Sequence, residues 1–128
     1  MTMSPRPRHL TLALLWPALA FACGACDEDK MAATYDHAVS QDAAAHQKAV
    51  VYCAVQGASQ PDRLRAVAAQ TDGVDPASVR VSSEPAALSF ALDKSVQSPE
   101  AAVAQMHKAL GGQVKLVVIK SVDPVAGR

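Results

Sequence analysis

Three cysteines and four histidines are the residues of this 128-residue chain whose side chains most readily do chemistry. Cys23 and Cys26 have the Cys-x-x-Cys spacing of dithiol redox pairs, in which a thiolate attacks a disulfide. Cys53 belongs to the apolar run 50–55, which favours a small buried thiol. We reject the redox pair because it lies at the end of an apparent export signal, and no thioredoxin-like context accompanies it.

The histidines lack the spacing of a metal site. His37 and His46 are nine residues apart, about two and a half helical turns, whereas ligands on one helix are normally three or four residues apart. His107 follows Met106 near the end of a predicted helix, where a cationic imidazole interacts favourably with the helix dipole. We interpret all three as surface residues and assign no metal ligand or cofactor. A copper or zinc site that also uses Met31 remains an alternative.

No set of residues matches a familiar catalytic arrangement. The sequence has no Gly-x-Ser-x-Gly nucleophile elbow, and no carboxylates are recognisable as an acid–base pair. The turn at residues 57–59 precedes a predicted helix, where an anion could bind, but it lacks the lysine and glycine density of a phosphate loop. We therefore predict that the protein is not an enzyme.

The first 22 residues have the composition of an export signal. Two arginines precede an uncharged apolar stretch, residues 10–21, and residues 20–22 form the small-x-small pattern found before a cleavage site. The apolar stretch is too short for a membrane-spanning helix, which needs about 20 residues. We expect a signal peptide over residues 1–22 and an exported, periplasmic protein.

The same stretch resembles a bacterial lipoprotein signal, because Cys23 and Cys26 each follow small residues, as an acylated cysteine does. The resemblance implies that one of them carries lipid and that the chain meets the membrane only through this anchor. Plain cleavage and secretion is the alternative. Export also permits disulfides, so Cys26 and Cys53 are a candidate pair if Cys23 is the lipidated residue.

Composition excludes several classes of partner. After residue 22 the chain has ten Lys and Arg, since two of the twelve come earlier, against twelve Asp and Glu, a net charge of about −2. This balance argues against nucleic acid, which requires a basic face, and against polybasic attachment to a membrane. Aromatic residues are too few to form an evident platform for stacking sugars or bases.

The chain after the signal divides into a polar segment, residues 23–47, one domain, residues 48–122, and a C-terminal tail, residues 123–128. Acidic residues 27–29 predict a solvated tether at the start of the polar segment. A weak helical periodicity from Tyr35 to His46 predicts an accessory helix with an alanine-rich face, which burial alone stabilises little.

Apolar runs and capping residues predict the elements of the domain. Residues 49–55 and 86–92 are predicted central strands, residues 79–82 a short strand, and residues 114–119 an apolar final strand. Ser59 and Ser98 are predicted N-caps of two helices. The predicted buried faces of these helices are Leu64, Val67 and Ala68 in the first, and Val103, Met106 and Leu110 in the second.

The resulting order, β-α-β-β-α-β, predicts an α+β fold of the ferredoxin-like, split β-α-β type. Its two β-α-β units form a four-stranded antiparallel sheet with two helices on one face. This topology places the last strand at an edge of the sheet. Its apolar sequence therefore predicts that the polar segment covers this edge, or that the edge is a docking surface.

Two short motifs in this framework, residues 55–57 and residues 98–102, each precede a predicted helix and resemble the SPOR domain, a septal peptidoglycan-binding repeat. The likeness extends over about residues 50–119. It implies the same fold, an envelope location and binding to glycan strands stripped of peptides. We carry over no binding residue from this family.

These features together predict a non-catalytic protein-binding module of the bacterial envelope, such as an inhibitor or immunity-type partner of an envelope-acting protein. A SPOR-type peptidoglycan-binding module and a periplasmic metal-binding protein are the alternatives.

Overall fold

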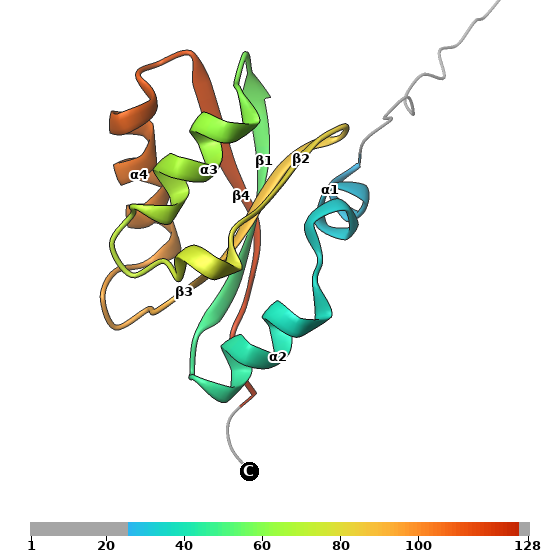
Figure 1. Ribbon diagram of the computed structural model, residues 1–128, viewed down its shortest axis with the longest axis vertical. Helices are drawn as coiled ribbons and strands as arrows, with labels where there is room; N and C mark the ends of the chain where they lie inside the picture. The colour runs from blue at the N-terminus through green and yellow to red at the C-terminus, as the bar shows by residue number, and fades with distance from the viewer. Residues whose placement is uncertain (1–25, 126–128) are drawn as a thin grey trace, which may run out of the picture.

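The computed structural model describes residues 26–125 (Figure 1). In chain order, these residues form α1 (Asp27–Thr34), α2 (His37–Ala45), β1 (Ala49–Gly57), α3 (Pro61–Ala69), β2 (Arg80–Ser83), β3 (Ala86–Leu92), α4 (Pro99–Leu110) and β4 (Val114–Val122). A short 3-10 helix, Pro76–Ser78, precedes β2. Over this range no helix has the length and apolar character needed to cross a membrane.

The strands form one four-stranded antiparallel sheet in the order β2-β3-β1-β4. α3 and α4 lie together on one side of it, which we call the first face, and α1 and α2 lie on the other, the second face (Figure 1). The arrangement is the predicted ferredoxin-like fold, with the first and third strands in the centre and β4 at an edge.

The main core lies between the sheet and the two helices of the first face. β1 is buried along residues 49–55, and β3 is buried along residues 87–92, as their apolar sequences predict. Phe90 of β3, Leu64 of α3 and Met106 of α4 are at most 1% exposed within this core. The predicted inner faces of both helices are therefore confirmed.

The two core helices differ in how well their starts were predicted. α4 begins as expected, because the Ser98 hydroxyl accepts a hydrogen bond from the Ala101 N–H at 3.1 Å. α3 begins one residue later than predicted, and its N-cap is Gln60 rather than Ser59. Neither the Gln60 side chain nor a serine caps this helix; Pro61, which is pre-organised for the first helical position, marks its start instead.

β4 is longer and less regular than predicted. It continues three residues past Ile119 to Val122, because its ladder with β1 extends as far as the pair Val50–Val122. The register shifts between Tyr52 and Cys53, which leaves Ile119 as an extra residue in β4. This β-bulge changes which β4 side chains reach the second face.

The polar segment is folded onto the second face. Acidic residues 27–29 form the first turn of α1 rather than a tether, although their side chains are exposed as expected. The accessory helix predicted over residues 35–46 is α2, which begins after Asp36, whose carboxylate accepts bonds from the N–H groups of Ala38 and Val39. α1 is a second helix that was not predicted, and it ends at Thr34 because the chain leaves helical geometry at Tyr35.

Polar and apolar contacts together hold these two helices to the sheet. Ser89 of β3 donates its hydroxyl to the Thr34 carbonyl at 3.2 Å, and both residues are buried. Arg80 of β2 donates to the Asp36 carboxylate at 3.0 Å. A small apolar cluster lies beneath them, formed by Ala43, Val50, Tyr52 and Ala91 with Met31 alongside.

This packing leaves one part of the sheet uncovered. α1 contacts β1, β2 and β3, and α2 contacts β1 and β3. Over β4, by contrast, second-face side chains stay exposed. The polar segment therefore covers a face of the sheet and not the β4 edge, which contradicts the first of the two roles predicted for this edge. The second role, a docking surface, stays a prediction.

Candidate functional site

The sheet separates the two cysteines that the structure describes. Cys26 is exposed at the N-cap of α1, where its thiol donates to the Asp29 carboxylate at 3.4 Å. Cys53 is 1% exposed and belongs to the core of the first face, whereas α1 lies on the second. Both thiols are free, so the Cys26–Cys53 disulfide does not form in this structure. Cys23 and the expected signal peptide lie outside the described residues.

Cys53 is the small buried thiol that its apolar surroundings predict. Burial raises the pKa of its thiol to about 12, because the thiolate would be desolvated there. The group is therefore protonated at neutral pH. It acts as a core residue and not as a nucleophile.

His37 and His46 lie on the exposed surface, as predicted. Nδ1 of His37 is 3.2 Å from the Tyr35 hydroxyl. Nδ1 of His46 is 2.8 Å from the Asp42 carbonyl and 3.2 Å from its carboxylate. Between residues 26 and 125, no three His, Cys, Asp or Glu side chains come together as a metal site would require.

His107 differs from the surface cation that we expected. It is half-buried, and its Nε2 atom accepts a hydrogen bond from the backbone N–H of Leu116 at 2.9 Å. An imidazole nitrogen that accepts a hydrogen bond carries no proton, so Nε2 is the unprotonated nitrogen of the ring in this contact. A backbone N–H in an edge strand points either to the neighbouring strand or outward. Because the Leu116 N–H points to His107, it lies on the outer side of β4, away from the ladder with β1.

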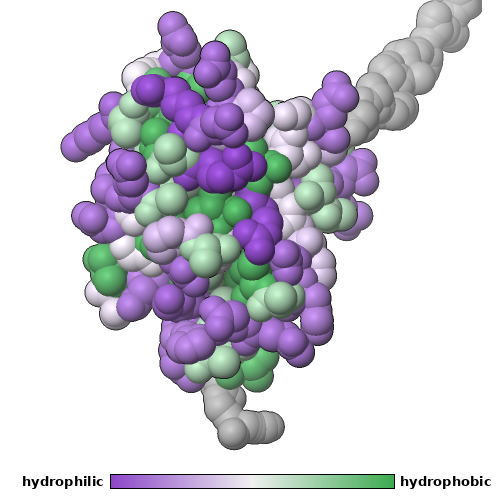
Figure 2. All heavy atoms as spheres, in the orientation of Figure 1, coloured by the Kyte–Doolittle hydropathy of each residue, from purple (hydrophilic) through white to green (hydrophobic). Residues whose placement is uncertain are grey.

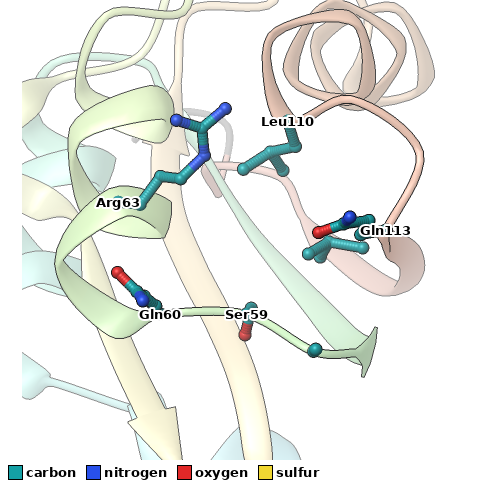
Figure 3. A pocket seen from close by; sticks show the side chains of 7 residues that line it. Ser59, Gln60, Arg63, Leu110 and Gln113 are labelled. Atoms are coloured by element: carbon teal, nitrogen blue, oxygen red, sulfur yellow. The ribbon is translucent and has the colours of Figure 1, made fainter.

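A cavity of about 320 Å³ opens between the start of α3 and the end of α4 (Figure 3). Arg63 lies on its α3 side and donates to the Ala109 carbonyl at 2.7 Å, which ties the two helices together. No carboxylate, histidine or cysteine is among the residues that line it: Ala58, Ser59, Gln60, Arg63, Leu110, Gln113 and Val114. The lining therefore offers a single cation and no acid–base pair.

A second hollow, of about 260 Å³, lies on the second face between α1 and β4. Its lining residues are mostly apolar and come from both elements and from β1: Met31, Ala32, Tyr35, Tyr52, Lys120 and Val122. Tyr35 is 53% exposed and Val122 44% exposed at its rim. Burial raises the pKa of the Tyr52 phenol, so this group is a neutral part of the lining.

Second-face side chains of β4 continue this apolar region. Val117 pairs with Ala54 and Val122 with Val50, and both valines are more than a third exposed. Two lysines, Lys115 and Lys120, alternate with them along the strand. We call these four side chains and the adjoining hollow the β4 surface. Neither lysine has an acidic partner within residues 26–125.

The sequence pattern did not reveal the β4 surface as a surface. Residues 114–119 were predicted as a nearly continuous apolar strand, but only Val114 and Leu116 are buried. The available signal was the placement of a lysine near each end of the strand, which marks exposed positions.

Comparison with protein families, curated proteins and solved structures finds no family model, protein or structure that matches the chain. The resemblance of residues 50–119 to SPOR domains therefore stays a prediction.

Proposed function

We propose that this protein is a non-catalytic binding module of the bacterial envelope and that another protein docks on its β4 surface. The observation that carries the proposal is the incomplete covering of the second face. α1 and α2 pack over the other three strands, while Val117 and Val122 of β4 remain exposed and Val122 borders an apolar hollow. Removing such a patch from water favours association.

The chemistry of the described residues supports binding rather than catalysis. No residue lining the cavity at Arg63 is a carboxylate, histidine or cysteine that could act as a general acid or base, and the Cys53 thiol is buried and protonated. The β4 surface combines an apolar centre with two charged residues, the pattern of a protein-binding surface with a polar rim. The envelope location follows from the predicted export signal and is part of the proposal.

Photocrosslinking in the native host tests the docking surface directly. We would replace Val117 with a photoreactive phenylalanine analogue and, as a matched control, replace Arg65, an exposed residue of α3 on the first face. A discrete protein adduct is expected from position 117 and not from position 65. Cell fractionation of the same strain tests the envelope location.

Two results would contradict the proposal. One is the absence of any adduct from position 117 in a folded, exported protein. The other is retention of the purified protein on peptidoglycan stripped of its peptides, with no protein adduct, which would favour the SPOR-type alternative.

A further inference from the structure

We infer that the docking partner presents an acidic amphipathic helix, which lies along the β4 surface beside α1 and α2. This inference rests on the proposed function and names the kind of segment that docks. Three features of the second face lead to it: the width left uncovered, the state of the β4 edge and the charge of β4.

The uncovered width suits one helix. Neighbouring strands are about 4.8 Å apart, so a four-stranded sheet with its outer side chains is about 20 Å wide. α1 and α2 follow one another along the chain, and both lie over β1 and β3, so they form a single row (Figure 1). A helix with its side chains is about 10 Å wide. Over β4 and its edge there is therefore space for a second row.

The outer edge of β4 is poorly suited to a partner strand. His107 already accepts a hydrogen bond from the Leu116 N–H, and the bulge at Ile119 interrupts the regular spacing of the backbone groups. Bulges and lysines are devices by which natural sheets prevent pairing at an edge. These features direct a partner to the side chains of the second face instead of the backbone of the edge.

The same bulge sets the charge of this face. Lys115 and Lys120 are five positions apart and would point to opposite faces of a regular strand. Because the register shifts between them, Lys120 pairs with Tyr52 and Lys115 with Gln56, so both belong to the second face. They are the only charged residues of β4, and both are positive.

A matching helix can be specified from these positions. Its apolar stripe would cover Val117, Val122 and the hollow between Val122 and α1. Its carboxylates would meet two lysines about 15 Å apart along the strand, which corresponds to about three helical turns. The exposed acids of residues 27–29 would repel such a helix from the start of α1 and so favour a position over β4.

Charge reversal combined with the crosslink at position 117 tests this inference. We would introduce Lys115→Glu and Lys120→Glu together, and use Lys108→Glu, an exposed change near the end of α4, as the matched control. The adduct yield is expected to fall roughly tenfold in the double variant and to stay unchanged in the control. Mass spectrometry of the adduct is expected to place the crosslink in an acidic, amphipathic helical segment. An unchanged melting temperature verifies that the double variant is folded.

The outcomes separate this inference from the proposed function. An adduct that is insensitive to charge reversal overturns the acidic helix, and so does a crosslink to an extended segment, a basic segment or a second copy of this chain. In each of these cases a protein still docks on β4. Loss of every adduct from position 117 in the otherwise unchanged protein overturns the proposed function itself.

Discussion

The Nε2 atom of His107 accepts a hydrogen bond from the Leu116 N–H at 2.9 Å, which joins the last turn of α4 to the outer edge of β4. The two residues are nine positions apart, across the Gly111-Gly112 turn that reverses the chain. The bond gives a partner to a backbone group that would otherwise face solvent at the sheet edge. It also makes His107 a structural acceptor.

Replacing His107 with alanine should loosen this edge without unfolding the domain. Hydrogen exchange at the Leu116 amide is expected to accelerate, and the free energy of unfolding to fall by about 1 kcal/mol, because the freed N–H can still bind water. His107→Gln keeps a hydrogen-bond acceptor, so its exchange rate and its free energy of unfolding should lie between those of His107→Ala and the native protein. Equal exchange rates at Leu116 in all three would show that the bond is not formed in solution.

Met106 is completely buried between α4 and the sheet, so changes there should act on the whole fold. Met106→Ala is expected to cost about 2–5 kcal/mol of unfolding free energy. Met106→Asp, which places a carboxylate in an apolar core, should abolish cooperative melting. Ala104→Asp, an exposed change on the same helix, is the control and should melt close to the native protein. A native-like melting temperature for Met106→Asp would contradict the described core.

The contact between Arg80 and Asp36 should make the packing of α2 sensitive to acid. The Arg80 guanidinium, together with the N–H groups of Val39 and Ala38, holds the pKa of Asp36 below its ordinary value of 3.8. A carboxyl whose pKa is lower in the folded chain stabilises the fold above its unfolded pKa, and this contribution is lost as pH falls through the folded value.

The native protein should therefore lose stability more steeply below about pH 4 than Asp36→Asn, which keeps a capping oxygen but no charge. Thermal melts across this pH range measure the difference. Asp62→Asn, on the exposed surface of α3, controls for the loss of one negative charge. Parallel stability curves for the native protein and Asp36→Asn would contradict a role for the Arg80 contact.

The two described cysteines should differ sharply in reactivity. Cys26 is exposed and should react with a maleimide in the native protein, whereas Cys53 should react only after denaturation. Peptide mapping by mass spectrometry distinguishes the two sites, and a denatured sample gives the full labelling of each. If Cys53 in the native protein is labelled as fast as Cys26, then β1 opens to solvent.

Most of the domain could be predicted from local patterns. Residues 49–55 are apolar at successive positions, and residues 86–92 are apolar except for Ser89, because both faces of these strands are covered. Ser98 precedes α4 with an ordinary capping arrangement. Such signals depend on neighbours in the sequence, which is why the order of strands and helices followed from them. The start of α3 was misplaced by one residue because Ser59 resembles a cap but does not act as one.

The second face could not be predicted in the same way. α1 and α2 pack there through small residues such as Ala43 and Ala91 and through bonds between distant residues, of which Ser89 to Thr34 is buried. Neither feature produces a strong hydrophobic period. The β4 surface was missed for a related reason: a single extra residue, Ile119, decides which side chains share a face, and a bulge has no evident signal in this sequence.

The folding of α1 onto the sheet has a consequence for how far the domain can travel. Three residues separate Cys23 from Asp27, where α1 begins, and four chain steps extend at most about 14 Å. A chain acylated at Cys23 would therefore be joined to the membrane by a tether that is shorter than the bilayer core, which is about 30 Å thick. Such a domain would stay at the lipid surface and meet its partners there, whereas the secreted form could diffuse freely.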